Sequence, residues 1–546
     1  RFGKKENVIL WHISNEFGGN FKDSTCHCEK CQKKFREWLK NKYGTLDKLN
    51  ASWWTGFWSH KYTDWDQIHS PSPQGECLTT ALTLDWKRFS SEQITDFCKM
   101  EADALREFSD LPTTTNMMGF FKGVDYNTLK NAVDIISWDN YPFWHERKDE
   151  VPEAVYTSAG HALMRSLKRE PFLLMESTPS SVSWRSHNPL KRPGMHMLSS
   201  MQAVAHGADS VQYFQWRKSR GGYEKFHGAV VDHKNGSDTR TFREVTEVGK
   251  RLEHLSGGIK TFLNRAKAAI VFDWENWWAV EDTRGPRQDL DYVKCVTDHY
   301  RAFWECGLDV DFVSMDDDFS GYRLLAAPLN YMYKKGYSEK VRAFVEAGGT
   351  YVTTYFSGIV NETDLCFIGR HPLEDVLGVV SEEMDAPSKE FENCFDYNGK
   401  EYPAYTMCDI VHAKAKTEIY SVYKKDFYKG CPVVTENAYG SGRAYYLSAE
   451  SDQRFLSAFY KDVFIKAGLL KEASSADRIL KRLPHGVTAA KREDETGRKG
   501  LVFVMNFNDR QVRLEGIGKQ IDAESGEVYE NVLEMAPFSC TILKLK

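Results

Sequence analysis

Short apolar runs alternate with longer amphipathic stretches over the first 258 residues. The runs predict strands at 8–14, 113–118, 133–138, 171–176 and 210–215, and the stretches between them predict helices at 90–109, 152–169 and 194–206. Strands that alternate with helices indicate parallel βα units. A closed (β/α)8 barrel needs eight strands. We therefore expect residues 1–258 to form a (β/α)8 TIM barrel whose first three strands lie upstream of residue 1; the alternative is an open five-stranded sheet.

The rest of the chain predicts two further domains. Residues 264–472 are predicted to form a second α/β domain, with strands at 267–273, 309–313, 324–328 and 350–354 and helices at 289–306, 337–347 and 452–468. Glycines in the segment 438–443 predict a hairpin there, because glycine tolerates positive φ. Residues 478–546 alternate apolar and polar positions, as in 501–507. This alternation predicts a small antiparallel β domain.

Two glutamates follow apolar runs of the predicted barrel. Glu16 comes after the run 8–13, and Glu176 comes after the run 171–175. Parallel barrels assemble their active sites at the carboxyl ends of their strands. An acid/base and a nucleophile, both carboxylates, suffice to cut a glycosidic bond with retention of configuration. We interpret Glu16 as the acid/base and Glu176 as the nucleophile; the alternative is that both are surface loop residues.

Polar residues near the two glutamates are candidates for supporting roles. Asn15 is placed to hydrogen-bond the sugar hydroxyl next to the reacting carbon, a contact that tightens at the transition state. Tyr141 ends the strand 133–138 and is expected to hydrogen-bond Glu176 and so keep it ionised. Asp139 is a second acid on that segment. We interpret it as a contact to a substrate hydroxyl or a structural bond rather than as the nucleophile.

Aromatic and polar residues in two loops are candidates for sugar recognition. Trp184 follows the nucleophile strand and is placed to stack on a sugar ring. The loop 215–228 contains Glu224 and His227 together with glycines and aromatics, a mixture that suits a binding rim. For each of these residues a plain surface role is the alternative.

Three cysteines, Cys26, Cys28 and Cys31, lie in the loop after Glu16. Three thiols within six residues favour a structural zinc ion with tetrahedral coordination. The fourth ligand stays open between His27, Cys77 and a residue upstream of residue 1. Reduced cysteines without a metal are the alternative. A catalytic metal is not needed, because the two glutamates already supply the chemistry.

Composition narrows the class of protein. The net charge of −5 and a pI of about 6.4 argue against a nucleic-acid partner, which needs a concentrated basic face. No apolar run approaches the roughly 20 residues that cross a bilayer, and we expect no signal peptide. The other cysteines are expected to be buried small hydrophobes in a reduced, cytoplasmic protein; they include Cys98, Cys295, Cys306, Cys366, Cys408 and Cys431.

The motifs together resemble glycoside hydrolase family 42, the β-galactosidases. The resemblance covers nearly the whole chain and rests on Trp11 to Gly18 with the three-cysteine loop, Phe35 to Leu39, Leu49 to Trp54, Phe57-Trp58, the nucleophile strand and Gln215 to His227. It implies a retaining β-galactosidase in which Glu16 is the acid/base and Glu176 the nucleophile. It further implies galactose contacts from Asn15, Trp184, Glu224 and His227, a trimerisation domain over 264–472, and a homotrimer whose active site is partly walled by a neighbouring subunit.

Other functions remain as alternatives. A related retaining glycosidase, such as an α-L-arabinopyranosidase, would act on a sugar that lacks only the hydroxymethyl arm of galactose. A barrel that binds carbohydrate without catalysis is a second alternative. The middle block also resembles glutamine-amidotransferase domains, but no cysteine there sits on a clear strand-to-helix elbow with a histidine partner. We therefore expect this block to be structural.

Overall fold

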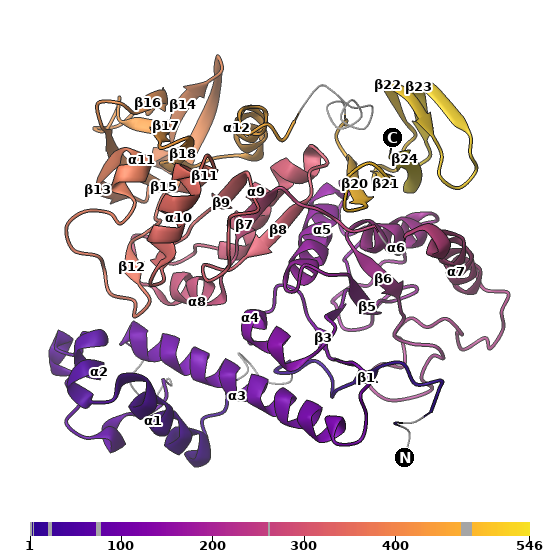
Figure 1. The fold of residues 1–546 in the computed structure, drawn as a ribbon, viewed down its shortest axis with the longest axis horizontal. Coiled ribbons are helices and arrows are strands. Elements are labelled where there is room, and N and C mark those ends of the chain that lie inside the picture. The colour runs from indigo at the N-terminus through magenta and orange to yellow at the C-terminus, as the bar shows by residue number, and fades with distance from the viewer. Residues whose placement is uncertain are drawn as a thin grey trace.

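The computed structural model describes residues 3, 5–19, 25–71, 78–259, 262–470 and 483–545. The chain forms three regions that follow one another along the sequence (Figure 1). The first region lies at the bottom of this view, the second at its upper left, and the C-terminal strands at its upper right. Cys77, one of the candidate zinc ligands, lies outside the described residues, as does the start of the predicted C-terminal domain.

Parallel strands in chain order form the centre of the first region. β1 pairs with β2, and β3, β4, β5 and β6 form one sheet in that order. β2 and β3 are the two parts of one predicted strand, interrupted at Thr115, so the five predicted strands are all present. The strands are shorter than predicted: β1 Trp11–His12, β2 Thr113–Thr114, β3 Asn116–Met117, β4 Ser137–Asp139, β5 Phe172–Glu176 and β6 Ala208–Val211.

Helices connect these strands and cover the sheet. The apolar faces of α5 and α6 are almost entirely buried, which explains why their sequences contain few charges. The helices of the described barrel segment are α4 Tyr126–Leu129, α5 Val151–Ser166, α6 Met195–Ala205 and α7 Arg240–Ile259. All three helices predicted for this region exist, although the first one begins ten residues earlier than expected, at Thr80.

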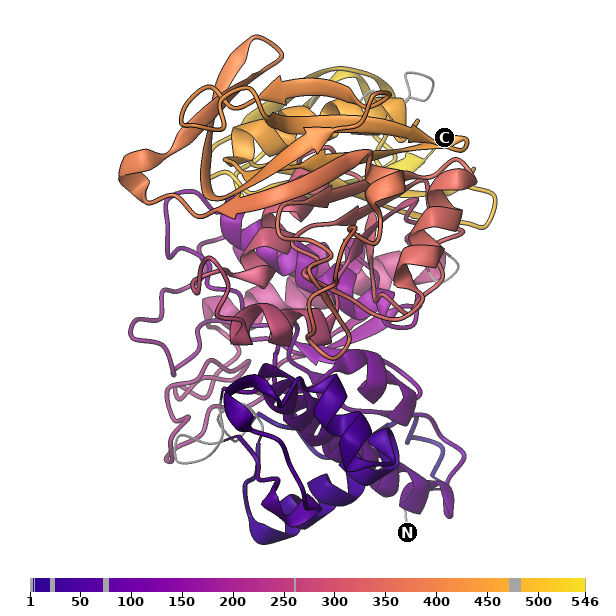
Figure 2. The ribbon, with the colours of Figure 1, turned by 90° about the vertical axis from the view of Figure 1, so that its left-hand side faces the viewer.

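A helical excursion between β1 and β2 carries the three-cysteine segment. It consists of α1 Glu29–Tyr43, α2 Leu46–Ser52 and α3 Thr80–Arg106, which Figure 2 shows at the bottom of the molecule. It has an aromatic core of its own around Phe35, Trp86 and Phe89. From α3, Lys87 reaches Asp282 of the second region with 2.8 Å between Nζ and Oδ1. The excursion is thus tied to both regions.

The second region is built on a seven-stranded sheet with the order β16-β17-β18-β11-β9-β7-β8. Its strands β7, β8, β9, β11 and β18 are parallel, and the predicted hairpin joins β17 to β18. The strands of this sheet are β7 Ala268–Val271, β8 Val310–Val313, β9 Leu324–Ala327, β11 Thr350–Thr354, β16 Glu418–Val422, β17 Pro432–Tyr439 and β18 Gly442–Leu447. The helices of the region are α8 Trp274–Asp282, α9 Tyr292–Glu305, α10 Tyr337–Glu346, α11 Glu374–Leu377 and α12 Gln453–Lys466. β10 Met332–Tyr333 and β12 Val360–Asn361 pair with each other outside this sheet.

A second sheet of this region escaped prediction. It contains β13 Val379–Asp385, β14 Asn393–Tyr397, β15 Lys400–Ala413 and β19 Ala449–Glu450. β13 exposes charged residues on much of its length, and the 14-residue β15 bends among three partner strands, so neither shows a clean alternation of apolar and polar residues.

The sharp turn after β11 in the second region carries a phenylalanine and not a nucleophile. Phe356 has a φ of 54°, and the chain continues from it to β12 rather than to a helix, whereas a nucleophile elbow is a strand-to-helix turn. Its ring stacks on Tyr331 at 4.9 Å between centroids. Cys295 lies instead on α9, where burial raises the pKa of its thiol. These observations support a structural role for this block.

The C-terminal region consists of antiparallel strands, as predicted. β20, β21 and β24 form one sheet and β22 and β23 another. The buried Arg492 of β20 ties the region to the barrel segment through Asp209, at 3.0 Å between Nη2 and Oδ1. The strands are β20 Val487–Glu493, β21 Gly500–Asn506, β22 Val512–Ile521, β23 Val528–Met535 and β24 Ser539–Leu545.

The expectation of buried cysteines holds only in part. Cys98 and Cys408 are buried, whereas Cys295, Cys306 and Cys431 are partly exposed. Cys366 is exposed, so its prediction was wrong. It lies on a loop between β12 and α11, where neighbouring apolar residues are exposed as well.

Candidate active site

Three neighbouring strands bring three polar side chains to one point. Asn116 begins β3, and Asp139 and Glu176 end β4 and β5. A shift in register after Trp138 places Asp139 directly opposite Glu176. Because adjacent strands are only about 4.8 Å apart, these side chains meet at the edge of the sheet formed by the strands' carboxyl ends.

Glu16 reaches the same point from a loop rather than from a strand end. β1 stops at His12, four residues earlier, and Glu16 adopts a positive φ of 42°. Such a backbone costs about 1–3 kcal/mol and persists only when the surroundings hold it. Here the Glu16 N–H donates to Oδ1 of Asn116 at 2.9 Å, and the Glu16 carbonyl accepts from Gly19 at 3.0 Å.

The two glutamates face each other at short range. One carboxylate oxygen from each of Glu16, Asp139 and Glu176 lies within 4.8 Å of the other two. Retaining glycosidases hold their two carboxyl groups about 5 Å apart, whereas inverting enzymes leave a wider gap for a water molecule. The separation therefore suits direct attack on the sugar.

Hydrogen bonds fix the orientation of Glu176. The predicted bond from Tyr141 is present, with 2.6 Å between Oη and Oε2. Asn116 Nδ2 donates to the other oxygen, Oε1, at 3.3 Å. Burial raises the pKa of Glu176, and the Tyr141 bond works in the opposite direction. Tyr141 thus favours the ionised carboxylate but does not fully offset its desolvation.

Asp139 and Asn116 are central to the site, and sequence reasoning missed Asn116. The Asn116 side chain is 1% exposed and also donates to Oδ1 of Asn15 at 3.0 Å and to Oδ2 of Asp139 at 2.5 Å. The sequence feature that could have indicated Asn116 is its polar carboxamide within a buried strand of threonines and methionines. Burial, followed by the charge of Glu176, raises the pKa of Asp139 to about 9.

The residues predicted to contact the sugar differ in how exposed they are and in how close to the carboxyl cluster they act. Trp184 is 45% exposed and meets the Tyr141 ring edge-on, at 4.9 Å between centroids. His227 is buried and its ring packs against Trp184. Its Nε2 hydrogen-bonds the Phe214 carbonyl oxygen at 3.0 Å, so His227 lies beneath the rim of the site rather than on it. Glu224 is partly buried and its charge acts on Glu176. Asn15 is exposed beside Glu16.

The three cysteines after Glu16 form a compact group at the start of α1. Their Sγ atoms lie within 4.8 Å of one another, and those of Cys28 and Cys31 are 3.6 Å apart. The N–H of Cys31 helps to lower the pKa of Cys28 to about 7. His27 is engaged elsewhere: its Nδ1 is 2.8 Å from Ser70 Oγ and its ring stacks on Trp86.

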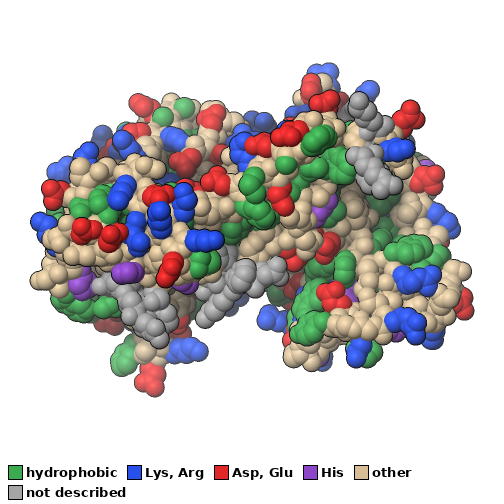
Figure 3. Space-filling view, turned by 90° about the horizontal axis from the view of Figure 1, so that it is seen from below, with side chains coloured by type: hydrophobic (Ala, Val, Ile, Leu, Met, Phe, Trp, Pro, Cys, Tyr) green, Lys and Arg blue, Asp and Glu red, His purple; other side chains and the backbone are tan. Residues whose placement is uncertain are grey.

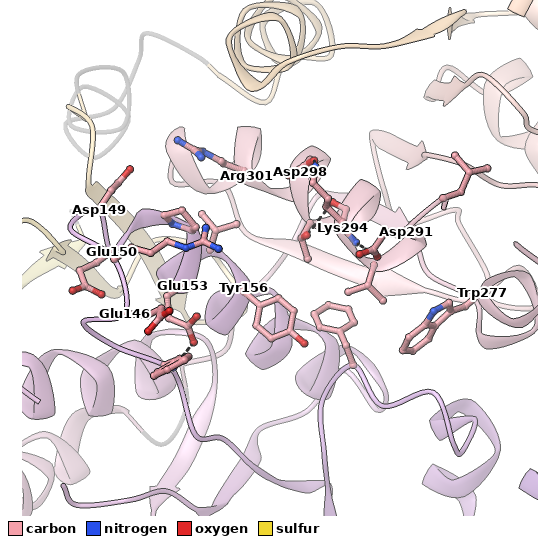
Figure 4. Close-up of a pocket in the computed structure, with 18 of the residues that line it drawn as sticks. Glu146, Asp149, Glu150, Glu153, Tyr156, Trp277, Asp291, Lys294, Asp298 and Arg301 are labelled. Carbon is pink, nitrogen blue, oxygen red and sulfur yellow. Dashed lines mark hydrogen bonds and ion pairs between the residues drawn. The ribbon is translucent and has the colours of Figure 1, made fainter. Parts of the chain in front are cut away.

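A separate cavity of about 880 Å³ lies between the barrel segment and the second region (Figure 4). It is bordered by the start of α5 and by α9, and it is rich in acidic side chains, among them Glu146, Glu150, Asp291 and Asp298. None of the three clustered carboxyl groups lines it. We therefore place the chemistry at the strand ends and not in this cavity.

The surface carries charges of both signs. On the face shown in Figure 3, Lys and Arg side chains are interspersed with Asp and Glu. Among the helices that the structure describes, none is long and apolar enough to span a bilayer.

Comparisons with known proteins identify the family of the chain. The family model described as β-galactosidase matches residues 1–255, and that described as β-galactosidase trimerisation domain matches residues 266–470. The chain belongs to glycoside hydrolase family 42. It is 47% identical to β-galactosidase BglY of Alicyclobacillus acidocaldarius over 93% of this chain and 73% of that protein. It is 43% identical to β-galactosidase Pbg of Clostridium perfringens over 100% of this chain and 80% of that protein.

Solved structures of the family share the fold. The β-galactosidase from Rahnella sp. R3 superposes with a TM-score of 0.93 at 46% identity, over 100% of this chain and 79% of that one. The family 42 β-galactosidase Gan42B from G. stearothermophilus gives 0.93 at 41% identity, again over 100% and 79%. The (β/α)8 barrel prediction is thereby confirmed. The activity is that of a retaining β-galactosidase, and the alternatives are not favoured.

Proposed function

We propose that Glu16 and Glu176 carry the hydrolysis of terminal, non-reducing β-D-galactosides by double displacement. The observation that supports these roles is the approach of their carboxylates to within 4.8 Å, across the width of one sugar ring. Glu176, oriented by Tyr141, attacks the anomeric carbon. Glu16 protonates the departing oxygen, so that the glycosidic bond breaks as the bond to Glu176 forms.

The second half of the reaction reverses these roles. Glu16, now ionised, takes a proton from water, whose oxygen attacks the anomeric carbon and displaces Glu176. In this proposal Asn15 contacts the hydroxyl next to the reacting carbon, Trp184 stacks on the sugar, and Glu224 and His227 complete the pocket. The exposed face of Trp184 and the effect of the Glu224 charge on Glu176 support these assignments.

The sugar preference can be tested with two nitrophenyl glycosides. We expect 4-nitrophenyl β-D-galactopyranoside to have a kcat/KM at least about tenfold above that of the α-L-arabinopyranoside, because a pocket built to bind the extra hydroxymethyl group loses its contacts with the shorter sugar. Equal or reversed kcat/KM values would favour the arabinopyranosidase alternative.

Tyr141→Phe tests the support of the nucleophile. The change removes the 2.6 Å hydrogen bond to Glu176, and a bond to a charged group contributes about 1.5–3 kcal/mol. We expect kcat to fall by about 10- to 100-fold. Since that bond lowers the pKa of Glu176, the acidic limb of the kcat/KM profile should also move to higher pH. Tyr156→Phe is the control, because Tyr156 lies on α5 away from Glu176; it should change neither kcat nor the acidic limb. An unmoved acidic limb in Tyr141→Phe would show that Tyr141 does not lower the pKa of Glu176.

We further propose that Cys26, Cys28 and Cys31 hold a structural zinc ion. Tetrahedral zinc with Zn–S bonds of about 2.3 Å separates its sulfur atoms by about 3.8 Å, and the 3.6 Å between Cys28 and Cys31 fits this value. The ion would clamp the start of α1 to the loop that follows Glu16. The fourth ligand is left open.

Metal analysis tests this site. We expect about one zinc ion per chain, and Cys28→Ser should lose it and lower the melting temperature by about 5 °C, because metal binding energy is folding energy. Cys366→Ser, at an exposed cysteine outside the group, should keep both the metal and the melting temperature. Full stability of metal-free Cys28→Ser would exclude a structural metal.

The assembly and the cellular setting are also proposals. The family model over residues 266–470 is that of a trimerisation domain, which supports a homotrimer. The eleven cysteines of the described residues all have free thiols. This supports a reduced, cytoplasmic setting.

A further inference from the structure

We propose that Glu16 and Asp139 form a carboxyl pair that shares one proton, and that Asp139 is a positioning residue that keeps this proton available to Glu16. The proposal rests on the function proposed above, in which Glu16 is the general acid and base. It adds a third carboxyl group to the machinery, one that need not touch the sugar.

The surroundings of Asp139 favour a proton between the two acids. Asp139 is 7% exposed, and its Oδ2 accepts from Asn116 at 2.5 Å. Its other oxygen, Oδ1, is buried and receives no N–H or O–H donor from a described residue. A carboxylate oxygen of Asp139 also lies within 4.8 Å of one of Glu16, and a hydrogen bond with Glu16 is among the causes that raise the pKa of Asp139. Two carboxyl groups can make such a bond only if one of them carries a proton.

The surrounding charges favour retention of that proton. Asp139 faces Glu176 across β4 and β5, and Tyr141 and Tyr126 also approach it from the end of β4 and from α4. The imidazole of His12 lies against Asn116, and burial lowers its pKa. No described cation is bonded to the three clustered carboxyl groups. Three adjacent negative charges in one partly buried cluster would repel one another strongly.

The shared proton keeps the charge of the cluster constant through the reaction. Before the reaction Glu176 is ionised and the pair carries one proton, so the three groups have a charge of −2. When Glu176 becomes a neutral ester, Glu16 has given its proton to the leaving group and the pair is fully ionised, which again makes −2. Attack by water returns the proton to Glu16 and frees the Glu176 carboxylate.

The cycle gives Asp139 a defined task. While Glu176 is ionised, its charge adds to the burial that raises the pKa of Asp139 to about 9, so the pair retains its proton at neutral pH. Once Glu176 is esterified, this repulsion disappears and an ionised pair is tolerated. Glu16 can therefore serve first as an acid and then as a base.

Asp139→Asn tests the pair without changing its shape. The amide oxygen can still accept from Asn116, while the amide N–H donates to Glu16 and stabilises the ionised form of that acid. We expect the alkaline limb of the kcat/KM profile to move at least about one pH unit lower. Below that limb, with Glu16 still protonated, activity should be largely kept.

Two substrates separate proton supply from structural damage. Lactose needs a proton on its leaving group, whereas 2,4-dinitrophenyl β-D-galactopyranoside does not. At pH 8 we expect Asp139→Asn to lower kcat/KM about tenfold or more on lactose and by less than about threefold on the dinitrophenyl substrate. Asp125→Asn is the matched control, since Asp125 is a buried acid with a raised pKa that caps α4 outside the cluster. It should leave both rates and the alkaline limb unchanged.

Several outcomes would overturn the proposal. An unmoved alkaline limb, equal losses on both substrates, or a change in KM alone would make Asp139 a structural residue or a contact to a sugar hydroxyl. A requirement for added Mg²⁺ or Mn²⁺, abolished by EDTA, would make the three carboxyl groups a metal site. Thermal unfolding of each variant controls for misfolding. Failure of the wild-type enzyme to hydrolyse either galactoside would instead refute the proposed function.

Discussion

Glu176→Gly should lower kcat on 4-nitrophenyl β-D-galactopyranoside by about 10⁴-fold or more, and sodium azide should restore much of it. The covalent intermediate cannot form without the carboxylate, and losses of this size follow the removal of a nucleophile. The glycine leaves room for azide next to the anomeric carbon. Azide then attacks from the side opposite the leaving group, so the product should be the α-galactosyl azide, which NMR of the anomeric proton identifies.

A matched change at the other end of the same strand is the control. Glu170 is exposed and precedes β5, whose carboxyl end carries Glu176. Glu170→Gly should keep the wild-type kcat and give no azide product. If Glu176→Gly kept full activity, Glu176 would not be the nucleophile.

Glu16→Ala should have an effect that depends on the leaving group. We expect kcat/KM on lactose to fall by about 10²- to 10⁴-fold, because the departing sugar oxygen needs a proton from the general acid. With 2,4-dinitrophenyl β-D-galactopyranoside the first step needs no proton, so the intermediate should accumulate and give a burst of dinitrophenol. Azide should speed its turnover and give the β-galactosyl azide, since it attacks the intermediate from the face that water uses.

The anomer formed separates the two roles. Opposite azide products from Glu16→Ala and Glu176→Gly would establish acid/base and nucleophile independently of rates. Glu6→Ala, at an exposed glutamate ten residues before Glu16, should show neither the burst nor an azide product. An equal loss on both substrates in Glu16→Ala would mean that Glu16 is not the proton donor.

Local sequence patterns predicted individual helices and strands better than they predicted which of these elements pack together. The apolar run before Glu176 marked β5, because a strand of a parallel sheet is covered on both faces, whereas β2, β3 and β4 are rich in buried polar residues and were predicted from short runs with few charges. The same rule located β7, β8, β9 and β11. The sheet containing β13 and β15 was missed, since exposed and bent strands carry no such signature. Domain limits near 258 and 472 stay predictions.

For the active site too, some residues could be identified from the sequence and others could not. Glu16, Glu176 and Tyr141 were identifiable because each stands at or just beyond the end of a strand in a barrel, where reactive groups collect. Asn116 was not, because nothing in its neighbourhood along the chain shows that it contacts Asn15, Asp139 and Glu176 at once.

By itself, the sequence determined the barrel class and the family, and it supplied the two carboxylates proposed to react, because these follow from residue type and order along the chain. Only the tertiary structure decided that Glu16 reaches the site through a left-handed loop and that Asp139 meets it there. The protonation of an acid depends on burial and on charges that lie far away in the chain, and folding alone brings these together.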